Sequence, residues 1–260
     1  MLAALMFFTR LPWWRLGSPS KKDFQRVVVY FSWVGWFTGL VMALVFFLSA
    51  YIFPVWVAII FALIARLIMT GCLHEDGLAD FFDGFGGGVT KERILEIMKD
   101  SHIGTYGVIA LIMYFMLFVA MIESNPLFDV FYDWQSIGYI ALCLFACDPL
   151  SKGIAINGVL LLPYARNEET AKSKIVYDAL SVGDRLISLS GALLPLLVLS
   201  IFVTPYLLLV AIAPIVTTAL LVSLMKRRLQ GYTGDCCGAT FLMSELASQI
   251  VVLMVSCHLC

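Results

Sequence analysis

The sequence predicts an all-α integral membrane protein, a polytopic helical bundle with about seven transmembrane helices in one domain over residues 1–260. Three observations predict it. The chain is 61% hydrophobic and only 13% charged, whereas soluble domains are about 25% charged. Its mean hydropathy is +0.94. Several apolar runs approach the roughly 20 residues that a helix needs to cross a bilayer. We expect these runs to be helical, because every backbone polar group in lipid needs a hydrogen-bond partner within the segment.

The apolar runs place the crossings in order along the chain. Pro54 and Pro205 each follow a very short connection and begin a run, where a missing backbone N–H costs a helix nothing. The N-terminal segment 1–15 carries its basic residues after its apolar part, unlike a signal peptide, so we expect a short, retained interfacial segment. The predicted crossings are 27–53, 54–73, 104–122, 137–162, 184–203, 205–225 and 239–258.

Lysine and arginine gather on one side of the predicted membrane. With a cytoplasmic N-terminus, nearly all of them fall in inside loops, and the outside connection 123–134 has none. The positive-inside rule therefore predicts a multi-pass protein of the cell (inner or plasma) membrane with its C-terminus outside. The polar loops 74–88, 99–107, 162–169 and 231–239 then share the cytoplasmic face, where we expect the active site. A net charge of −1 gives no nucleic-acid signature.

The stretch HEDGLADFFDGFGGG, residues 74–88, concentrates carboxylates and glycines in an otherwise apolar chain. Asp76, Asp80 and Asp83 are spaced i, i+4, i+7, which places them on one face of a helix. Stacked like charges destabilise a helix unless a cation lies between them, and an all-oxygen ligand set suits Mg²⁺ or Mn²⁺. We therefore expect these aspartates to be both metal ligands and catalytic groups. A solvated loop is the alternative, which explains the charge but not the spacing.

The residues around the aspartates extend this interpretation. His74 would point to the opposite face of a continuous helix, so we expect it to contact substrate or to support the metal ligands. The glycines of 84–88 are expected to end the helix and to offer backbone N–H groups to an anion. Thr90 would then cap an interfacial helix, KERILEIMKD, that carries Arg93 and Lys99 beside an apolar stripe.

Other ionisable residues each leave two interpretations open. Asp148 and Lys152 are spaced i, i+4 inside the fourth crossing, so they form a structural pair or Lys152 reaches a phosphate. Arg66 pairs with Glu245 or extends toward the membrane surface, and intramembrane charges of this kind suggest function by default. Asp235 lies in a glycine-rich stretch and is either a further metal ligand or a turn residue.

Residues 74–107 resemble the cobalamin synthase family, the adenosylcobinamide-GDP ribazoletransferases of bacterial B12 assembly. The family pattern His-x-Asp-Gly-Leu-Ala-Asp-x-x-Asp-Gly matches HEDGLADFFDG, and Arg-x-Leu-Glu-Ile-Met-Lys/Arg-Asp-Ser-x-x-Gly-Thr matches RILEIMKDSHIGT. FFTRLP at 7–12, YAR at 164–166, and TGD followed by GA within 233–239 are also similar to the family. The resemblance therefore spans nearly the whole chain.

The resemblance implies a phosphoryl transfer. A ribose hydroxyl of α-ribazole, or of its 5′-phosphate, attacks the phosphorus attached to cobinamide, and GMP leaves. The three aspartates would hold Mg²⁺ (or Mn²⁺) across the pyrophosphate of adenosylcobinamide-GDP, and Asp80 or Asp83 would accept the hydroxyl proton. Beside the lipid bilayer, other B12-assembly enzymes or a second copy of the chain are partners to consider. The expected substrate contacts are His74, Arg93, Lys99, Asp100, Ser101, Lys152, Arg166 and Asp235.

Four positions depart from the family pattern. Glu75 stands where an apolar residue is frequent, His102 and Lys152 where Arg is usual, and Leu242 where Glu is common. A histidine would make a phosphate contact weaker or pH-dependent, and lysine lacks the bidentate geometry of arginine. None of the four removes an aspartate of the predicted metal site, so activity is still expected.

Three other classes of protein use clustered carboxylates. A CDP-alcohol phosphotransferase has a similar Asp-Gly-x-x-Ala opening but expects Arg where this chain has Asp80. A prenyltransferase needs a second aspartate-rich block. A divalent-cation transporter should place acidic residues along a path at mid-membrane, where only Asp148 and Glu245 qualify.

Overall fold

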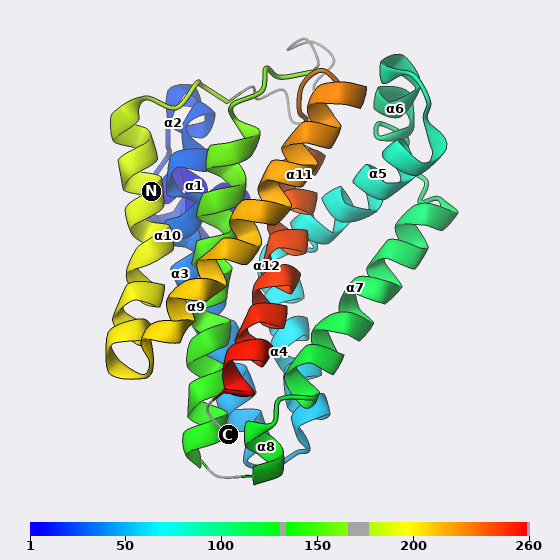
Figure 1. Cartoon of the computed structure of the whole chain (residues 1–260). Coiled ribbons are helices and arrows are strands. Elements are labelled where there is room, and N and C mark those ends of the chain that lie inside the picture. Colours follow the sequence, from blue (N-terminus) through cyan, green and yellow to red (C-terminus); the bar gives the residue numbers. More distant parts are fainter. Residues whose placement is uncertain (131–133, 166–176, 259–260) are drawn as a thin grey trace.

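The computed structural model describes residues 1–130, 134–165 and 177–258, and within these ranges it is helical with no β-sheet (Figure 1). The predicted all-α bundle is confirmed. The long helices are α3 (Phe31–Ala50), α4 (Val55–Thr70), α5 (Leu73–Gly87), α7 (Thr105–Glu123), α9 (Trp134–Val159), α10 (Val182–Phe202), α11 (Ile212–Arg228) and α12 (Gly234–Ser256). The shorter ones are α1 (Leu2–Phe8), α2 (Lys21–Gln25), α6 (Lys91–Ile97), α8 (Leu127–Val130) and the 3₁₀ turns η1 (Trp13–Leu16), η2 (Val27–Tyr30) and η4 (Pro205–Ala211).

Among the described residues, six helical stretches are long and apolar enough to cross a bilayer. They correspond to all the predicted crossings except the second. That one, expected over 54–73, is the 16-residue helix α4, which is followed by α5 at a bend of 92°. The pair is a seventh span only if it counts as one broken crossing.

The bend between α4 and α5 has a local cause. Gly71 has a φ of 65° and Cys72 a φ of 57°, so two successive residues leave the right-handed helical region. Gly71 also packs closely against the N-terminal segment, since a Cβ at this position would lie 2.3 Å from Nε of Arg10. The backbone N–H of Arg10 donates to the carbonyl oxygen of Met69 at 2.7 Å. Together these contacts end α4 and redirect the chain into α5, which rises toward α6 (Figure 1).

Small residues determine how closely the central helices pack. On α3, a Cβ at Gly35 would lie 2.6 Å from the Cα of Pro149, and one at Gly39 would lie 2.9 Å from the carbonyl oxygen of Phe145. These positions let α3 and α9 approach with their backbones almost in contact, as is typical of helix pairs in membranes. The outer faces carry large exposed apolar side chains such as Leu220 of α11, which suit contact with lipid.

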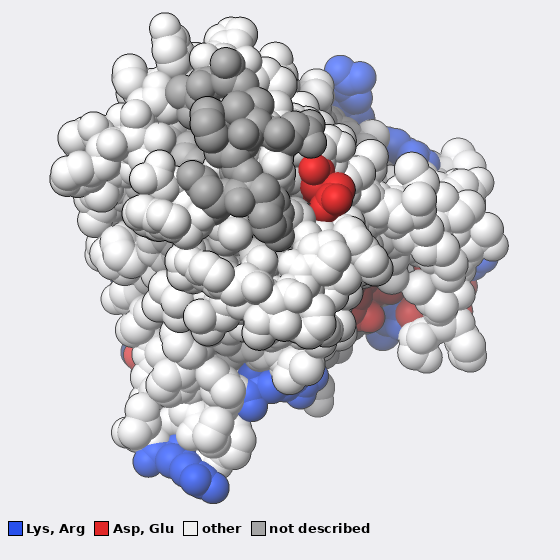
Figure 2. Space-filling view, turned by 90° about the horizontal axis from the view of Figure 1, so that it is seen from below, with Lys and Arg blue, Asp and Glu red and all other residues white. Residues whose placement is uncertain are grey.

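The two ends of the bundle differ in charge. Helices α2 and α6 and the last turn of α11, which holds Lys226, Arg227 and Arg228, lie at one end, whereas α8 and the end of α12 lie at the other (Figure 1). We call the first the basic end. Seen from the opposite end, the surface is mostly uncharged: a small acidic patch lies inside the outline, and the other acidic atoms and the Lys and Arg side chains lie toward its edge (Figure 2).

Candidate active site

The aspartate helix α5 packs closely against the start of α12. A Cβ at Gly77 would lie 3.1 Å from the Cα of Asp235, and one at Gly238 would lie 3.2 Å from the Cα of His74. Glycine at both positions therefore lets the two backbones approach each other. Asp235 lies in the first turn of α12, so this packing brings it beside the 74–83 block although the two are far apart in the sequence.

A cavity of about 160 Å³ lies where these two helices meet. Three of the predicted site residues line it, namely His74, Asp76 and Asp235. Its other walls come from α1, η2, the start of α3, the end of α9 and the segments that carry Tyr164 and Tyr177, and they are mainly apolar and aromatic. The cavity lies toward the basic end, because α3 and α12 begin there and α9 ends there (Figure 1).

The three aspartates of α5 have different surroundings. Asp76 is exposed, Asp80 is half-buried and Asp83 is buried. Asp83 accepts the backbone N–H of Gly104 at 2.7 Å and that of Gly107 at 2.9 Å, one on each carboxylate oxygen. A Cβ on either glycine would lie 2.4 or 2.5 Å from these oxygens. Asp83 thus joins α5 to the first turn of α7 and holds the end of the 99–107 segment against the aspartate helix.

The glycines after Asp83 do not form the anion-binding loop that we expected. Helix α5 continues through most of the 84–88 run. A Cβ at Gly84 would lie 2.5 Å from Cγ of Met98, and one at Gly86 would lie 2.6 Å from the ring of Tyr106. The run does end the helix, as predicted, but only at Gly87 and Gly88, because intrinsic propensity is a weak guide where packing demands a residue without a side chain. These glycines make room for α6 and α7.

The end of α5 is stabilised by a residue from α11. Arg228 donates to the carbonyl oxygen of Phe85 at 2.7 Å and also to that of Gly88. Carbonyl groups in the last turn of a helix have no partner within the helix, so this arginine caps α5. The predicted cap of the next helix is confirmed, since Oγ1 of Thr90 accepts the N–H of Arg93 at 3.3 Å.

The predicted substrate contacts between 93 and 102 lie on the surface. Arg93, Lys99 and Ser101 are exposed, and none of them lines the cavity. Asp100 accepts both the backbone N–H of His102, at 3.0 Å, and a ring nitrogen of the same residue at 2.7 Å. These two contacts lower the pKa of Asp100, the backbone N–H contributing more than the ring. The pair closes the turn that leads to Gly104.

Lys152 is fully buried and does not line the cavity. Its ammonium group donates to Oγ1 of Thr38 at 2.7 Å and to the carboxylate of Asp148, and it lies 4.4 Å from the ring centre of Phe241. Thr38 in turn donates to Asp148 at 2.9 Å. Of the two interpretations left open for Lys152, the structure shows the pair with Asp148, which joins α9 to α3 inside the bundle. The contact of Lys152 with a substrate stays a prediction.

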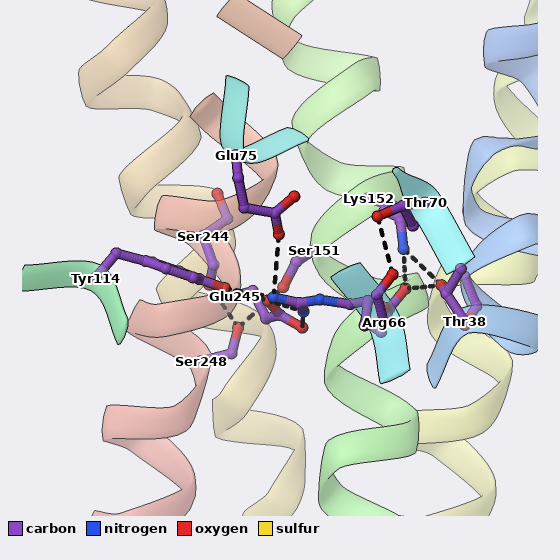
Figure 3. A network of polar contacts seen from close by, with 12 residues as sticks. Thr38, Arg66, Thr70, Glu75, Tyr114, Ser151, Lys152, Ser244, Glu245 and Ser248 are labelled. Atoms are coloured by element: carbon purple, nitrogen blue, oxygen red, sulfur yellow. Dashed lines mark hydrogen bonds and ion pairs between the residues drawn. The ribbon is translucent and has the colours of Figure 1, made fainter. Parts of the chain in front are cut away.

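A second buried cluster surrounds Arg66 (Figure 3). Arg66 donates to both carboxylate oxygens of Glu245, at 2.7 and 2.6 Å, and to the hydroxyl of Tyr114 at 2.8 Å. Of the two interpretations left open for Arg66, the structure shows the pair with Glu245. Glu75 lies 3.7 Å from the same guanidinium and has no hydrogen-bond partner among the described residues. This cluster connects α4, α7 and α12 to the first turn of the aspartate helix.

The segment before 166 is joined to the start of α12. The backbone N–H of Ala165 donates to the carbonyl oxygen of Tyr232 at 2.8 Å, and that of Tyr232 donates to Pro163 at 3.0 Å. Tyr164 therefore lies next to the turn that leads to Asp235. Arg166, the remaining predicted substrate contact, lies outside the described residues.

Within the described part of the chain, no group of three or more His, Cys, Asp or Glu side chains is arranged to hold a metal ion. Mg²⁺ at phosphoryl-transfer sites is usually held by one or two carboxylates, while substrate phosphates and water complete its ligands. Asp76 and Asp80, one turn apart on the accessible part of α5, fit that requirement. Asp83 differs from them because both of its oxygens already accept backbone N–H groups.

Sequence reasoning missed several residues that build the site. Phe7, Phe8 and Tyr177 line the cavity, although we expected the N-terminal segment to lie at the interface. Gly104 and Gly107 surround the carboxylate of Asp83. Gly104 and Gly107 could have been recognised in the sequence, since residues without side chains at a fixed spacing indicate that another group approaches the backbone closely. No pattern within the N-terminal segment indicates its contact with the start of α5.

Comparisons with known proteins show the family of the chain. The family described as cobalamin-5-phosphate synthase matches residues 1–253. An adenosylcobinamide-GDP ribazoletransferase of Shewanella amazonensis is 36% identical over 98% of this chain and 94% of its own. Those of Shewanella oneidensis and Shewanella woodyi are 34% and 36% identical, over 97% and 96% of this chain and 92% and 93% of their own. No solved structure matches the chain significantly.

Proposed function

The chain belongs to the cobalamin-5-phosphate synthase family, and on that basis we propose that it is an adenosylcobinamide-GDP ribazoletransferase. It joins adenosylcobinamide-GDP to α-ribazole, or to α-ribazole 5′-phosphate, and releases GMP. The observation that carries the proposal is the meeting of α5 and the start of α12 at one cavity, where Asp76 and Asp235 lie together. Carboxylates beside a helix N-terminus are the components needed to bind a metal-bridged diphosphate.

The start of α12 supplies donors for the diphosphate. Its first turn has backbone N–H groups without partners inside the helix, and the dipole of a 23-residue helix favours an anion there. Gly234 opens the turn, and a Cβ at this position would meet no atom of the described residues within 4 Å. A phosphate can therefore approach the backbone at this point without displacing a side chain.

Asp76 and Asp80 would hold Mg²⁺; of these two, Asp76 lines the cavity, beside Asp235. Bound there, Mg²⁺ supplies neutralisation of the pyrophosphate charge. Asp83 positions the site by fixing α7 against α5. The hydroxyl oxygen of the acceptor ribose forms a bond to the phosphorus that carries cobinamide, and the bond from this phosphorus to the oxygen of GMP breaks. Asp80 is placed to accept the hydroxyl proton, since it lies one turn from Asp76 on the same helix.

The basic end of the molecule faces the cytoplasm in this proposal. The cavity lies toward this end, so both nucleotide substrates reach it from the cytoplasm. The support is the one-sided distribution of lysine and arginine, which sets orientation in short-looped membrane proteins.

The test is an assay of the detergent-purified chain with adenosylcobinamide-GDP, α-ribazole and Mg²⁺. We expect GMP and a cobalamin to form in equal amounts, and chelation of Mg²⁺ to stop the reaction. Without α-ribazole the pyrophosphate should remain largely intact, because in-line attack requires an aligned acceptor. Release of CMP from a CDP-alcohol, with adenosylcobinamide-GDP untouched, would instead identify a lipid-type phosphotransferase.

A further inference from the structure

We infer that the aromatic cavity between α1, α5 and α12 binds the base of the acceptor nucleoside, and that His74 donates a hydrogen bond to the unsubstituted ring nitrogen of that base. The inference rests on the proposed function, and it adds a location and a recognition chemistry for one substrate. The ligand class is a planar bicyclic heteroaromatic ring with a single acceptor nitrogen, as in a benzimidazole riboside.

The walls of the cavity suit a flat aromatic ring. Phe8 and Phe31 lie with ring centres 4.5 Å apart, and Phe7 meets the ring of Tyr177 edge-on at 6.3 Å. All four of these residues line the cavity. An apolar cavity of about 150 Å³ is large enough to hold benzene, and this one, at about 160 Å³, is open at the side of Asp76. Stacking on aromatic side chains binds a base without requiring many hydrogen bonds.

His74 provides the polar contact in this apolar setting. It is 3% exposed and packs among aromatic rings, with Phe31 at 5.4 Å and Phe241 at 5.0 Å. Neither of its ring nitrogens has a hydrogen-bond partner among the described residues. A buried polar group without a partner is costly, and a neutral imidazole offers one N–H donor. Both ring nitrogens have almost no accessible surface, so a ligand with one acceptor nitrogen would satisfy that donor once the imidazole ring turns toward the cavity.

The same features argue against the guanine of adenosylcobinamide-GDP as the base that occupies the cavity. Guanine presents several donors and acceptors on its edges and needs a matching set of polar groups. Thr233, another polar side chain at the cavity, already serves as the cap of α12 by accepting the N–H of Cys236 at 3.4 Å. Most of the lining is apolar or aromatic, Tyr164 and Tyr177 add hydroxyl groups, and Asp76 and Asp235 are its carboxylates. A base placed inside would therefore direct its ribose hydroxyl toward the carboxylates, where the phosphorus is attacked.

The test separates binding of the two substrates. Phe7→Leu removes a half-buried aromatic wall, His74→Leu removes the donor, and His74→Gln restores an N–H donor. Phe47→Leu is the matched control, since Phe47 is a half-buried aromatic residue of α3 that does not line the cavity. For Phe7→Leu and His74→Leu we expect the KM for α-ribazole to rise about tenfold or more. The KM for adenosylcobinamide-GDP should change less than twofold, and His74→Gln should recover part of the loss.

Two binding measurements make the result independent of turnover. Equilibrium dialysis of the wild-type chain with α-ribazole alone should show retention that Phe7→Leu weakens and Phe47→Leu does not. Free dimethylbenzimidazole should compete with α-ribazole but not with adenosylcobinamide-GDP. If Phe7→Leu weakens GMP binding instead, guanine occupies the cavity and the inference is wrong.

If Phe7→Leu and His74→Leu remain active with unchanged KM values for α-ribazole and adenosylcobinamide-GDP, the cavity binds no base. The inference is then wrong and the proposed function is unaffected. If wild-type turnover is absent, the proposed function fails. Equilibrium dialysis still tests whether the cavity binds the base in that case. Retention of α-ribazole by the wild type that is lost in Phe7→Leu supports the inference, and no retention by the wild type overturns it.

Discussion

The three aspartates of α5 have the same charge and lie on the same helix, yet they have different surroundings. Asp76 and Asp80 remain accessible, with Asp76 at the cavity. Asp83 is buried and accepts two backbone N–H groups of α7. A carboxylate used in this way acts as a cap for a neighbouring helix. In the proposed function, one short motif therefore combines the groups that take part in the reaction with the group that docks a helix.

This difference predicts distinct effects for isosteric substitutions. Asp76→Asn and Asp80→Asn should lower turnover about a hundredfold or more, because each removes a negative ligand from the proposed metal site. The thermal midpoint in detergent should stay at the wild-type value. Asp83→Asn should lower the free energy of unfolding by about 1–3 kcal/mol, since one buried N–H loses its acceptor. If Asp76→Asn and Asp80→Asn both keep nearly wild-type turnover, the assignment of Asp76 and Asp80 to the metal site is wrong.

At the scale of helices, the site depends on three close approaches made by glycine. Gly77 and Gly238 bring α5 and α12 together, and Gly107 brings α7 to the carboxylate of Asp83. None of these contacts involves the reacting groups directly. They determine where Asp76, Asp235 and the 99–107 segment lie relative to one another.

Substitution of Gly107 tests this role of the helix contacts. In Gly107→Ala the new Cβ would lie 2.5 Å from Oδ2 of Asp83 and 3.0 Å from the carbonyl oxygen of Ala79, so the start of α7 must move. We expect a loss of about 1–3 kcal/mol in stability, as for other overpacked sites, together with reduced turnover. Gly138→Ala in α9 is the control, since its Cβ would meet Phe47 at an ordinary 3.7 Å. Thermal unfolding of both variants measures the difference, and equal midpoints would contradict the prediction.

The sequence predicts the helices well and their junctions poorly. Apolar runs identify spans because lipid forces every backbone group to find a partner within the segment. The bend at Gly71 depends on contact with Arg10, which lies on another segment. The 84–88 glycines were expected to form a loop, but packing against α6 and α7 makes them helical. Spacing did indicate the aspartate face, whereas the aromatic cavity arises from segments far apart in the sequence.

At the scale of the whole molecule, charge is divided between the interior and one end. The interior pairs connect helices: Arg66 with Glu245 joins α4 to α12, and Lys152 with Asp148 adds a contact to α3. Breaking a buried pair by removing one partner typically costs about 3–5 kcal/mol. Such pairs therefore hold the bundle in one arrangement around the cavity. The remaining lysine and arginine residues lie mainly at the basic end.

That uneven surface charge predicts the orientation of the bundle in the membrane, and cysteine labelling measures it. In a background with all seven native cysteines replaced, Val89→Cys places a thiol between α5 and α6 at a position that is 87% exposed. Ser124→Cys places one at the other end, just after α7. A membrane-impermeant maleimide should label Ser124→Cys in intact cells and Val89→Cys only after the cells are opened, because basic loops are retained in the cytoplasm. Both variants lie outside the cavity and should retain turnover, which verifies that the labelled protein is folded. Labelling of Val89→Cys in intact cells would invert the proposed orientation and place the cavity on the side that cytoplasmic nucleotides do not reach.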